Sequence, residues 1–188
     1  SHITVIGIGG VGSWAAESLA RSGVGHITLV DMDDICVSNI NRQSHALSST
    51  IGREKVFVMK ERLELINPNL KVTTCFDFFT SESMEYILNQ KADFILDSMD
   101  SVAHKCLLIA ECQKRNMPII TVGAAGSRKD PTKIQVKDLN RTINDKMAKR
   151  MKRILKKDYD YRRLSNRPYE IPCVFSSELV PAIQETLP

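Results

Sequence analysis

Short apolar runs alternate with longer amphipathic segments along most of the chain. Runs rich in β-branched residues, typical of buried strands, occur at 2–8, 26–30, 71–76, 93–96 and 118–122. Segments with apolar residues at helical spacing lie between them, at 11–22, 53–66, 81–89 and 102–115. Strands that alternate with helices favour a parallel sheet with helices on both faces. The pattern therefore predicts an α/β fold, a Rossmann-like, doubly wound and mainly parallel sheet.

The pattern changes after residue 130. Residues 132–137 alternate like a strand, and residues 144–157 form an amphipathic helix with Met147, Met151, Ile154 and Leu155 on its apolar side. Beyond residue 158, prolines at 168, 172 and 181 predict a loop. The first strand begins almost at residue 1, and no closing element is visible near residue 188. We expect a single domain over 1–188 that is a piece of a longer protein.

Composition excludes several classes of protein. The 188 residues are 43% hydrophobic and 26% charged, which excludes a disordered or low-complexity chain. No apolar run reaches 18 residues and no signal-peptide pattern is visible, so we expect a soluble protein. Five widely spaced cysteines argue against a disulfide framework and against paired zinc cysteines, and we expect no zinc. Free thiols indicate a reducing compartment, and we expect a cytoplasmic protein.

Positive charge is concentrated in one segment. Residues 146–167 hold ten Lys and Arg against two Asp, a net charge of +8, whereas the whole chain carries +4. The remainder is therefore mildly acidic. Such a segment is typical of a nucleic-acid contact, although a solvated basic helix would show the same pattern. The candidate nucleic-acid contacts are Lys149, Arg150, Lys152, Arg153, Lys156 and Lys157.

A glycine-rich turn joins the first predicted strand to the first helix. Gly7, Gly9, Gly10 and Gly12 form a GxGxxG pattern, which permits close approach of the backbone to a phosphate at a helix N-terminus. The motif indicates a nucleotide and does not choose NAD over ATP. Asp31, 24 residues after Gly7, suits the ribose hydroxyls.

Further charged and polar residues follow the second and fourth strands. Asp33 and Asp34 next to Asp31 disfavour NADP, because three acids would repel a 2′-phosphate. Arg42 and Lys55 suit the charges of a triphosphate, and Asp97 and Asp100 offer an acid for Mg²⁺. A hydride-transfer enzyme has no need of this second pair of cations.

These segments carry a family resemblance. The runs GIGGVGS, LVDMDD, SNINRQ and LDSMDS, with the 52–55 segment, resemble the adenylation domain of the ThiF/MoeB/HesA superfamily, relatives of ubiquitin-activating enzymes. The runs DPTKIQVKDL and PCVFSSE extend the resemblance to residues 3–178. They are most similar to the branch that dehydrates threonylcarbamoyladenosine in tRNA.

The resemblance implies a role for each matched residue. The four glycines would form the nucleotide turn, and Asp31, with Asp33 beside it, would bind the ribose. Asn39, Arg42 and Lys55 would hold the phosphates of ATP. Asp100 would lie at the Mg²⁺ and γ-phosphate, supported by Asp97, and Ser98 is a further candidate for cofactor binding. The set expected to act in catalysis is Arg42, Lys55 and Asp100.

The family's chemistry implies the reaction and the partners. A substrate carboxylate attacks the α-phosphate of ATP, and pyrophosphate leaves. In the dehydratase branch the carboxylate belongs to the threonyl group of the modified adenosine at tRNA position 37, and ring closure then releases AMP. Relatives are dimers, so we expect a homodimer, with sulfur-transfer proteins of the cysteine-desulfurase type as further partners. We expect an N-terminal segment and a C-terminal part of the relatives to lie outside these 188 residues.

Other interpretations remain open from the sequence. A related enzyme would adenylate the C-terminal glycine of a ubiquitin-like sulfur carrier. An NAD-dependent oxidoreductase would explain the glycine turn and Asp31 but would leave Arg42 and Lys55 without a role. A scaffold that only binds nucleotide would not need these cations. Cys173 is either a thiol nucleophile or, as its type predicts, a small buried core residue.

Overall fold

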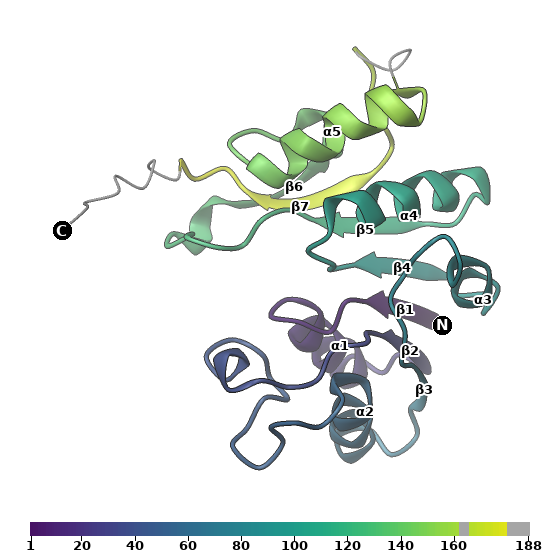
Figure 1. Ribbon diagram of the computed structural model, residues 1–188, viewed down its shortest axis with the longest axis vertical. Coiled ribbons are helices and arrows are strands. Elements are labelled where there is room, and N and C mark those ends of the chain that lie inside the picture. Colours follow the sequence, from purple (N-terminus) through teal and green to yellow (C-terminus); the bar gives the residue numbers. More distant parts are fainter. Residues whose placement is uncertain (162–165, 180–188) are drawn as a thin grey trace. The chain divides into compact units, whose positions relative to one another are not determined.

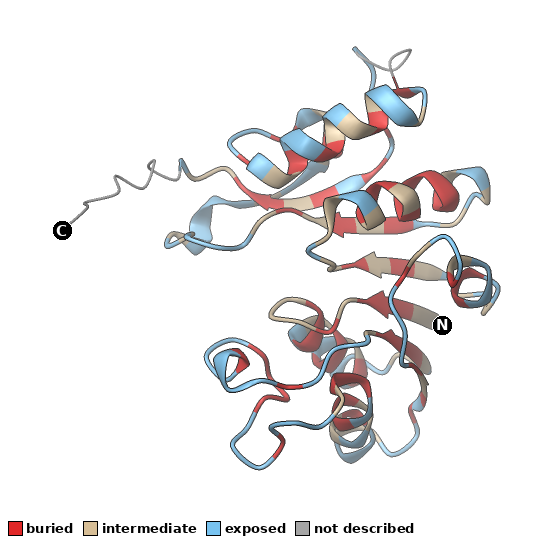
Figure 2. Cartoon of the chain, viewed as in Figure 1, coloured by how far each residue is buried: buried red, intermediate tan, exposed pale blue. Residues whose placement is uncertain are grey.

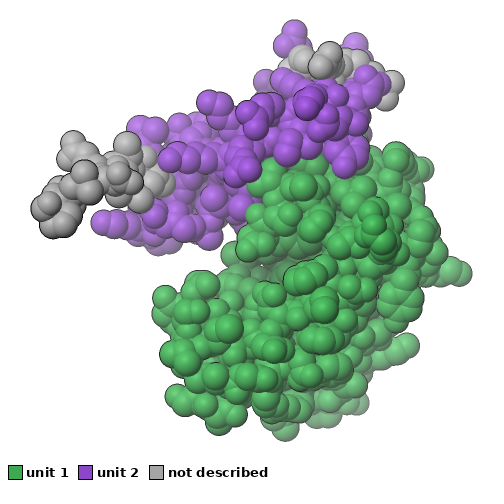
Figure 3. Space-filling model, viewed as in Figure 1, with its two compact units in different colours: residues 1–121 green, residues 122–188 purple. Residues whose placement is uncertain are grey.

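The structure is a computed structural model that describes residues 1–161 and 166–179 (Figure 1). The chain divides into two compact units, Ser1–Thr121 and Val122–Pro188 (Figure 3). Arg162 and Arg163, two members of the basic segment, lie outside the described residues. A single domain over 1–188 stays a prediction.

The first unit is built on five parallel strands. Their order in the sheet is β3-β2-β1-β4-β5. Ile6 at the end of β1 is level with Val30 of β2 and with Asp97 of β4, so three strands end at one edge of the sheet. The strands are β1 (His2–Ile6), β2 (His26–Val30), β3 (Lys71–Cys75), β4 (Phe94–Asp97) and β5 (Ile119–Val122).

The connections of this unit explain why it is doubly wound. Two helices carry the chain from β1 towards β3, and two others carry it in the opposite direction towards β5. Because crossovers between parallel strands are right-handed, the two pairs cover opposite faces. This confirms the predicted α/β fold. The helices are α1 (Gly12–Arg21), α2 (Lys55–Ile66), α3 (Met84–Leu88) and α4 (Val102–Lys114).

The core of the first unit lies between the sheet and its helices. Val5 and Leu29 from the strands pack with Met59 and Leu63 of α2 in one buried cluster. In Figure 2, buried residues occur in every strand of this unit and along α4. Truncating a side chain as deeply buried as Leu63 to alanine costs about 2–5 kcal/mol. The helical spacing in 53–66 therefore identified a true core face.

The second unit contains an antiparallel strand pair and one long helix. β6 (Ile134–Asp138) pairs with β7 (Pro172–Ser176), with Ile134 opposite Ser176. The expected loop beyond residue 158 is wrong at 172–176. Pro172 is tolerated because it is the first residue of the strand, and the run from Cys173 to Phe175 favours extended backbone.

Helix α5 (Lys146–Asp158) begins where a side chain caps it. The Asp145 carboxylate accepts a hydrogen bond from the Ala148 N–H (2.7 Å). Met151 and Leu155 are fully buried, as the apolar spacing predicted. Turns of 3-10 helix occur at Val37–Asn39, Pro131–Lys133 and Leu139–Arg141, and the second delays the expected strand at 132 by two residues. Among the described residues, no helix is long and apolar enough to cross a membrane.

Candidate functional site

The candidate site lies where β1 and β4 end side by side. The connections after these two strands run in opposite directions, and such a switch point leaves a crevice beyond the carboxyl ends of the strands. The glycine-rich turn follows β1, and the 97–100 segment follows β4. Topology alone thus brings together two groups of residues that are about 90 positions apart.

Gly7 and Gly12 allow the two segments to touch. A Cβ on Gly7 would lie 2.9 Å from the backbone of Ser98 and Met99, and Gly7 has a φ of +89°. A Cβ on Gly12 would lie 1.9 Å from the Gly7 carbonyl oxygen. The Ser98 hydroxyl donates to that same oxygen (2.6 Å). The turn is therefore fixed against the end of β4, and only glycine fits at these two positions.

Helix α1 begins at the glycine turn of this site. No side chain caps it, and its first turn contains no acidic residue. The first N–H groups of a helix lack intrahelical partners and carry a partial positive charge. A phosphate placed at this turn would therefore find donors that the protein's own side chains do not occupy.

Asp31 connects the end of β2 to the glycine turn. One carboxylate oxygen accepts the Ile8 N–H (2.6 Å), and the other accepts the Asp33 N–H (2.9 Å). Burial raises the pKa of Asp31, while these hydrogen bonds act in the opposite direction. Each oxygen has a second lone pair, so the carboxylate can still accept hydrogen bonds from ribose hydroxyls.

Lys55, the first residue of α2, is held beside these acids. Its Nζ lies 2.6 Å from Asp33 Oδ2 and 3.9 Å from Asp31 Oδ1, and its side chain is 6% exposed. A buried ammonium fixed by two carboxylates is a positioned cation, with little side-chain freedom left to lose on binding a phosphate.

Arg42 lies over the glycine turn. The Cγ and Cδ atoms of Arg42 would be 3.2 and 3.3 Å from a Cβ on Gly10, so glycine at this position makes room for the arginine. The Trp14 Nε1–H donates to the Arg42 carbonyl oxygen (2.9 Å) and ties this segment to α1. The guanidinium donates to the Ser38 carbonyl oxygen (2.8 Å) and remains exposed.

Asn39 is fixed by a local hydrogen bond. Its Oδ1 accepts the Cys36 N–H (3.1 Å), within the 3-10 turn at Val37–Asn39. The Nδ2 amide is the only part of this side chain that can donate to a phosphate, and the bond at Oδ1 orients it.

Asp97 and Asp100 occupy different environments. Asp97 is fully buried and pairs with the equally buried Lys105 (3.0 Å); it also accepts the Thr121 hydroxyl (2.6 Å) and the Met99 N–H (3.2 Å). It therefore shapes the turn that leads to Asp100, which is exposed just before α4. One exposed carboxylate fits Mg²⁺, because this ion is commonly bound by one or two carboxylates together with substrate phosphates.

The contacts thus join most of the predicted site residues. The glycine turn meets Ser98, Asp31 and Arg42 directly, and Lys55 is joined to the turn through Asp31. Asp100 follows this group in sequence, with its side chain exposed. The assignment of each residue to ATP or Mg²⁺ stays a prediction. Among the described residues there is no group of three His, Cys, Asp or Glu side chains arranged to hold a metal ion.

Sequence reasoning missed two residues near this site. Lys105 was not singled out, although it shares the apolar stripe of α4 with Leu108, Ile109 and Cys112, all buried. A lysine among buried apolar positions indicates that a buried acidic side chain lies close to it. His45 is 1% exposed, neither ring nitrogen has a hydrogen-bond partner, and burial lowers its pKa to about 4.

The basic helix and Cys173 belong to the second unit. Arg150, Arg153 and Lys157 are exposed, as a nucleic-acid contact requires. Lys152 is half-buried, donates to the Thr142 carbonyl oxygen (2.9 Å), and has a pKa lowered by burial. Cys173 is fully buried in β7, which favours its interpretation as a core residue.

Comparison with known proteins identifies clear relatives. The model of the ThiF family matches residues 1–162. A Haemophilus influenzae protein named tRNA threonylcarbamoyladenosine dehydratase is 48% identical over 178 residues, which cover 95% of this chain and 68% of that protein. The crystal structure of the Escherichia coli tRNA N6-threonylcarbamoyladenosine dehydratase in complex with ATP superposes with a TM-score of 0.94 at 46% identity, covering 97% of this chain and 75% of that chain.

A second adenylating enzyme is less similar. The Escherichia coli sulfur carrier protein ThiS adenylyltransferase is 36% identical over 126 residues, which cover 67% of this chain and 50% of that protein. The aligned region covers 68%, 66% and 62% of the dehydratases of Haemophilus influenzae, Escherichia coli and Bacillus subtilis.

Proposed function

Because the chain belongs to the ThiF family, we propose that it is an ATP-dependent adenylating enzyme that dehydrates threonylcarbamoyladenosine at position 37 of tRNA. The observation that carries this proposal is the likeness, over 97% of the chain, to a dehydratase structure determined with ATP. The related Escherichia coli structure with AMP fits the same reaction, because AMP is the nucleotide that such an enzyme releases.

In the first step, a threonyl carboxylate oxygen bonds to the α-phosphorus of ATP. The bond from this phosphorus to the oxygen that bridges it to the β-phosphate breaks, and pyrophosphate leaves. Negative charge grows on the leaving phosphates, so fixed cations at Lys55 and Arg42 lower the barrier. The turn at Gly7 and the start of α1 hold the nucleotide in line with the carboxylate.

In the second step, the carbamoyl group of the same nucleoside attacks the activated carbonyl carbon. The bond between this carbon and the AMP oxygen breaks, and the attacking group loses its proton. The nucleoside thereby loses one carboxylate oxygen to AMP and one proton from the carbamoyl group, which, relative to its neutral carboxylic acid form, is the net loss of one water. Both reacting groups belong to one nucleoside, so the closure is intramolecular and needs no protein thiol. The burial of Cys173 is consistent with this route.

Asp100 is the residue proposed to hold Mg²⁺ with the phosphates. When bound there, the ion supplies neutralising charge to the β- and γ-phosphates. Asp97 acts only through position, because its carboxylate is enclosed by Lys105 and Thr121.

The proposed macromolecular substrate is tRNA. The exposed cations of α5, with Arg150, Arg153 and Lys157 among them, support a contact with the tRNA backbone. We further propose that the protein acts in the cytoplasm as a homodimer and associates with sulfur-transfer proteins. These three statements rest on the family resemblance.

A sulfur-carrier adenylyltransferase is the second candidate, and its adenylation step would use the same nucleotide site. The sulfur-carrier enzyme is 36% identical over 67% of this chain, whereas the dehydratase is 48% identical over 95% of it. The comparison therefore supports the dehydratase more strongly. The NAD-dependent oxidoreductase is disfavoured, because it gives no role to Lys55 fixed beside Asp31 and Asp33.

The test is a reaction with ATP, Mg²⁺ and tRNA that carries threonylcarbamoyladenosine. We expect AMP and a nucleoside lighter by one water, in equal amounts. AMP formed only with a ubiquitin-like carrier protein would support the second candidate. No AMP with either substrate would contradict both.

A further inference from the structure

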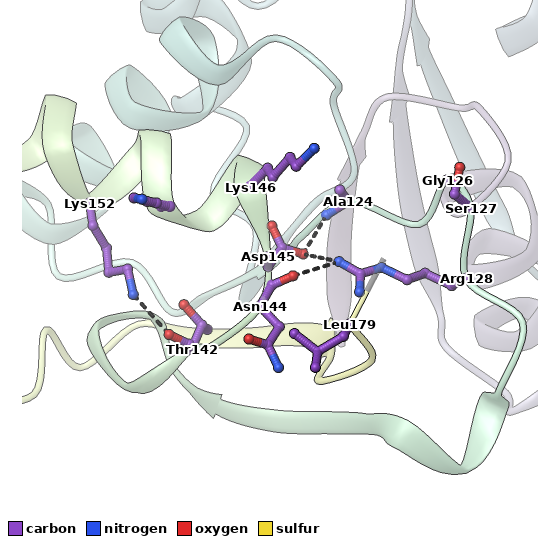
Figure 4. A pocket seen from close by; sticks show the side chains of 11 residues that line it. Ala124, Gly126, Ser127, Arg128, Thr142, Asn144, Asp145, Lys146, Lys152 and Leu179 are labelled. Carbon is purple, nitrogen blue, oxygen red and sulfur yellow. Dashed lines mark hydrogen bonds and ion pairs between the residues drawn. The ribbon is translucent and has the colours of Figure 1, made fainter. Parts of the chain in front are cut away.

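The second unit contains a pocket of about 690 Å³ that the proposed reaction does not use (Figure 4). It lies at the start of α5 and is lined by the loop after β5 and by Leu179 beyond β7. Its volume is in the range of pockets that bind small ligands or parts of larger ones. Its charged lining residues are Arg128, Asp145, Lys146, Lys149 and Lys152.

The single acid in this lining is enclosed by the protein. Asp145 has no exposed side-chain surface; its Oδ2 accepts the Ala124 N–H (2.9 Å), and its Oδ1 accepts the Ala148 N–H (2.7 Å). A Cβ on Gly123 would lie 2.4 Å from Oδ2, so the backbone closes over the carboxylate. With four cations and one enclosed acid, the lining presents a net positive charge to a ligand.

Arg128 is a buried cation with an unused donor. Its guanidinium donates to the Asn144 carbonyl oxygen (3.0 Å) and to the Glu178 carbonyl oxygen, and its Nη2 lies 3.9 Å from Asp145 Oδ2. Its side chain is 11% exposed, and the Nε–H is buried without a hydrogen-bond partner. Such a donor is costly to leave unpaired, and an anion in the pocket would lower this cost.

The lysines extend the cationic wall along α5. Lys146, Lys149 and Lys152 recur at three-residue spacing, which places them along one side of the helix. Lys152 is tied to Thr142, whereas Lys146 and Lys149 are exposed. Figure 4 shows Lys152 reaching towards Thr142 and Arg128 reaching towards Asn144 and Asp145. Two positioned cations and two adaptable ones suit an anionic group that enters from solvent.

We propose that this pocket binds a phosphodiester group of the tRNA backbone, with Lys146 and Lys149 as its ion-pair partners and Arg128 as its positioned charge. This inference rests on the proposed function, which supplies tRNA as the substrate. It separates these two lysines from the other exposed cations of α5, Arg150, Arg153 and Lys157, because only these two of them line the pocket. Leu179 adds an apolar surface for the sugar next to the phosphate.

The first test compares two double variants for binding of tRNA that carries threonylcarbamoyladenosine. Lys146→Gln with Lys149→Gln removes two exposed charges from the pocket. Lys133→Gln with Lys137→Gln removes two exposed lysine charges from the same unit, outside the pocket lining. We expect the pocket variant to bind this tRNA about tenfold more weakly than the unaltered protein. The slope of log affinity against log salt concentration should be smaller in magnitude by about one. The control variant should change affinity less than twofold.

The second test maps the phosphate. Ethylation of single tRNA phosphates should reveal one position that weakens binding to the unaltered protein and no longer weakens binding to the pocket variant. The affinity for ATP alone should be equal in both proteins. A pocket variant that loses ATP affinity and retains tRNA affinity would assign the pocket to a free nucleotide and overturn the proposal.

The remaining outcomes distinguish this inference from the proposed function. If the unaltered protein binds and dehydrates the tRNA while the pocket and control variants bind it equally well, the pocket proposal is wrong and the proposed function stands. If the unaltered protein does not bind the tRNA, both are wrong. Equal thermal unfolding of the variants and the unaltered protein shows that the comparison concerns binding.

Discussion

Lys105 and Asp97 form an ion pair of 3.0 Å between two side chains with no exposed surface. The pair joins α4 to the end of β4, where Asp97 also accepts the Met99 N–H (3.2 Å). A buried carboxylate at this position orders the turn that leads to Asp100, so one interaction couples the core to the candidate site.

Removing the lysine should therefore destabilise the protein. Lys105→Met leaves the Asp97 charge buried without its counter-ion, which we expect to lower the free energy of unfolding by about 3–5 kcal/mol. Urea denaturation measures this change. Lys105→Met combined with Asp97→Asn removes both charges and should recover part of the loss. A single variant as stable as the unaltered protein would show that the pair is not needed.

The glycine turn offers a matched pair of substitutions. Gly12→Ala would place a Cβ 1.9 Å from the Gly7 carbonyl oxygen, whereas Gly9→Ala would meet its nearest neighbour, Gln43, at 3.9 Å. We expect Gly12→Ala to abolish ATP binding and Gly9→Ala to retain the fold and most of its stability. Calorimetric titration with ATP and thermal unfolding measure both effects. Similar behaviour of the two variants would contradict the assigned geometry.

Substitutions of Asp100 and Lys55 should reduce the formation of AMP. Asp100 is exposed, so Asp100→Ala should change stability by less than about 0.5 kcal/mol while abolishing AMP formation. Lys55→Met should lower the rate of AMP formation about 10²–10³-fold, because it removes a positioned cation from the phosphates. Single-turnover release of AMP from labelled ATP gives both rates. Near-normal turnover in either variant would show that its role is wrongly assigned.

His45 should make stability depend on pH. Burial lowers its pKa to about 4, below the ordinary value of 6.5, so the unfolded chain binds more protons between these values. The stability that neutral His45 allows is fully present above pH 6.5 and is lost as pH falls towards 4. The loss reaches about 3 kcal/mol.

Urea denaturation at pH 7 and pH 5 measures this effect. His2 and His26 also have pKa values lowered by burial, so His45→Gln is compared with the unaltered protein to isolate His45. The variant should show a flatter dependence on pH. An equal slope in both proteins would mean that His45 is protonated as readily in the folded state as in the unfolded chain.

The fold could be predicted from local signals, and its exceptions have physical reasons. Short apolar runs and segments with helical spacing can each be recognised from residues that are close in sequence. Their alternation predicted the doubly wound sheet. Strand β7 was not predicted, because it has only five residues and begins with Pro172. It also pairs with β6, which lies more than 30 residues earlier in the chain. That pairing is decided by long-range contacts, which periodicity does not report.

Some residues of the candidate site could also be recognised from local sequence, whereas others depend on contacts between distant parts of the chain. The glycine turn and Asp31 were recognisable because their spacing follows from a strand-turn-helix unit. Lys105 was not recognisable, because lysine is usually exposed. Only the buried Asp97, five residues before α4 begins, explains its position. His45 carries no pattern in sequence that distinguishes a buried ring from an exposed one.

The measurement that tests adenylation most directly follows oxygen from the substrate carboxylate. The tRNA is prepared with ¹⁸O in the threonyl carboxylate, and the AMP released with ATP and Mg²⁺ is analysed by mass spectrometry. Attack of the carboxylate on the α-phosphate predicts that each AMP carries one ¹⁸O atom and that the nucleoside loses one water. AMP without ¹⁸O, formed together with the dehydrated nucleoside, would contradict the account.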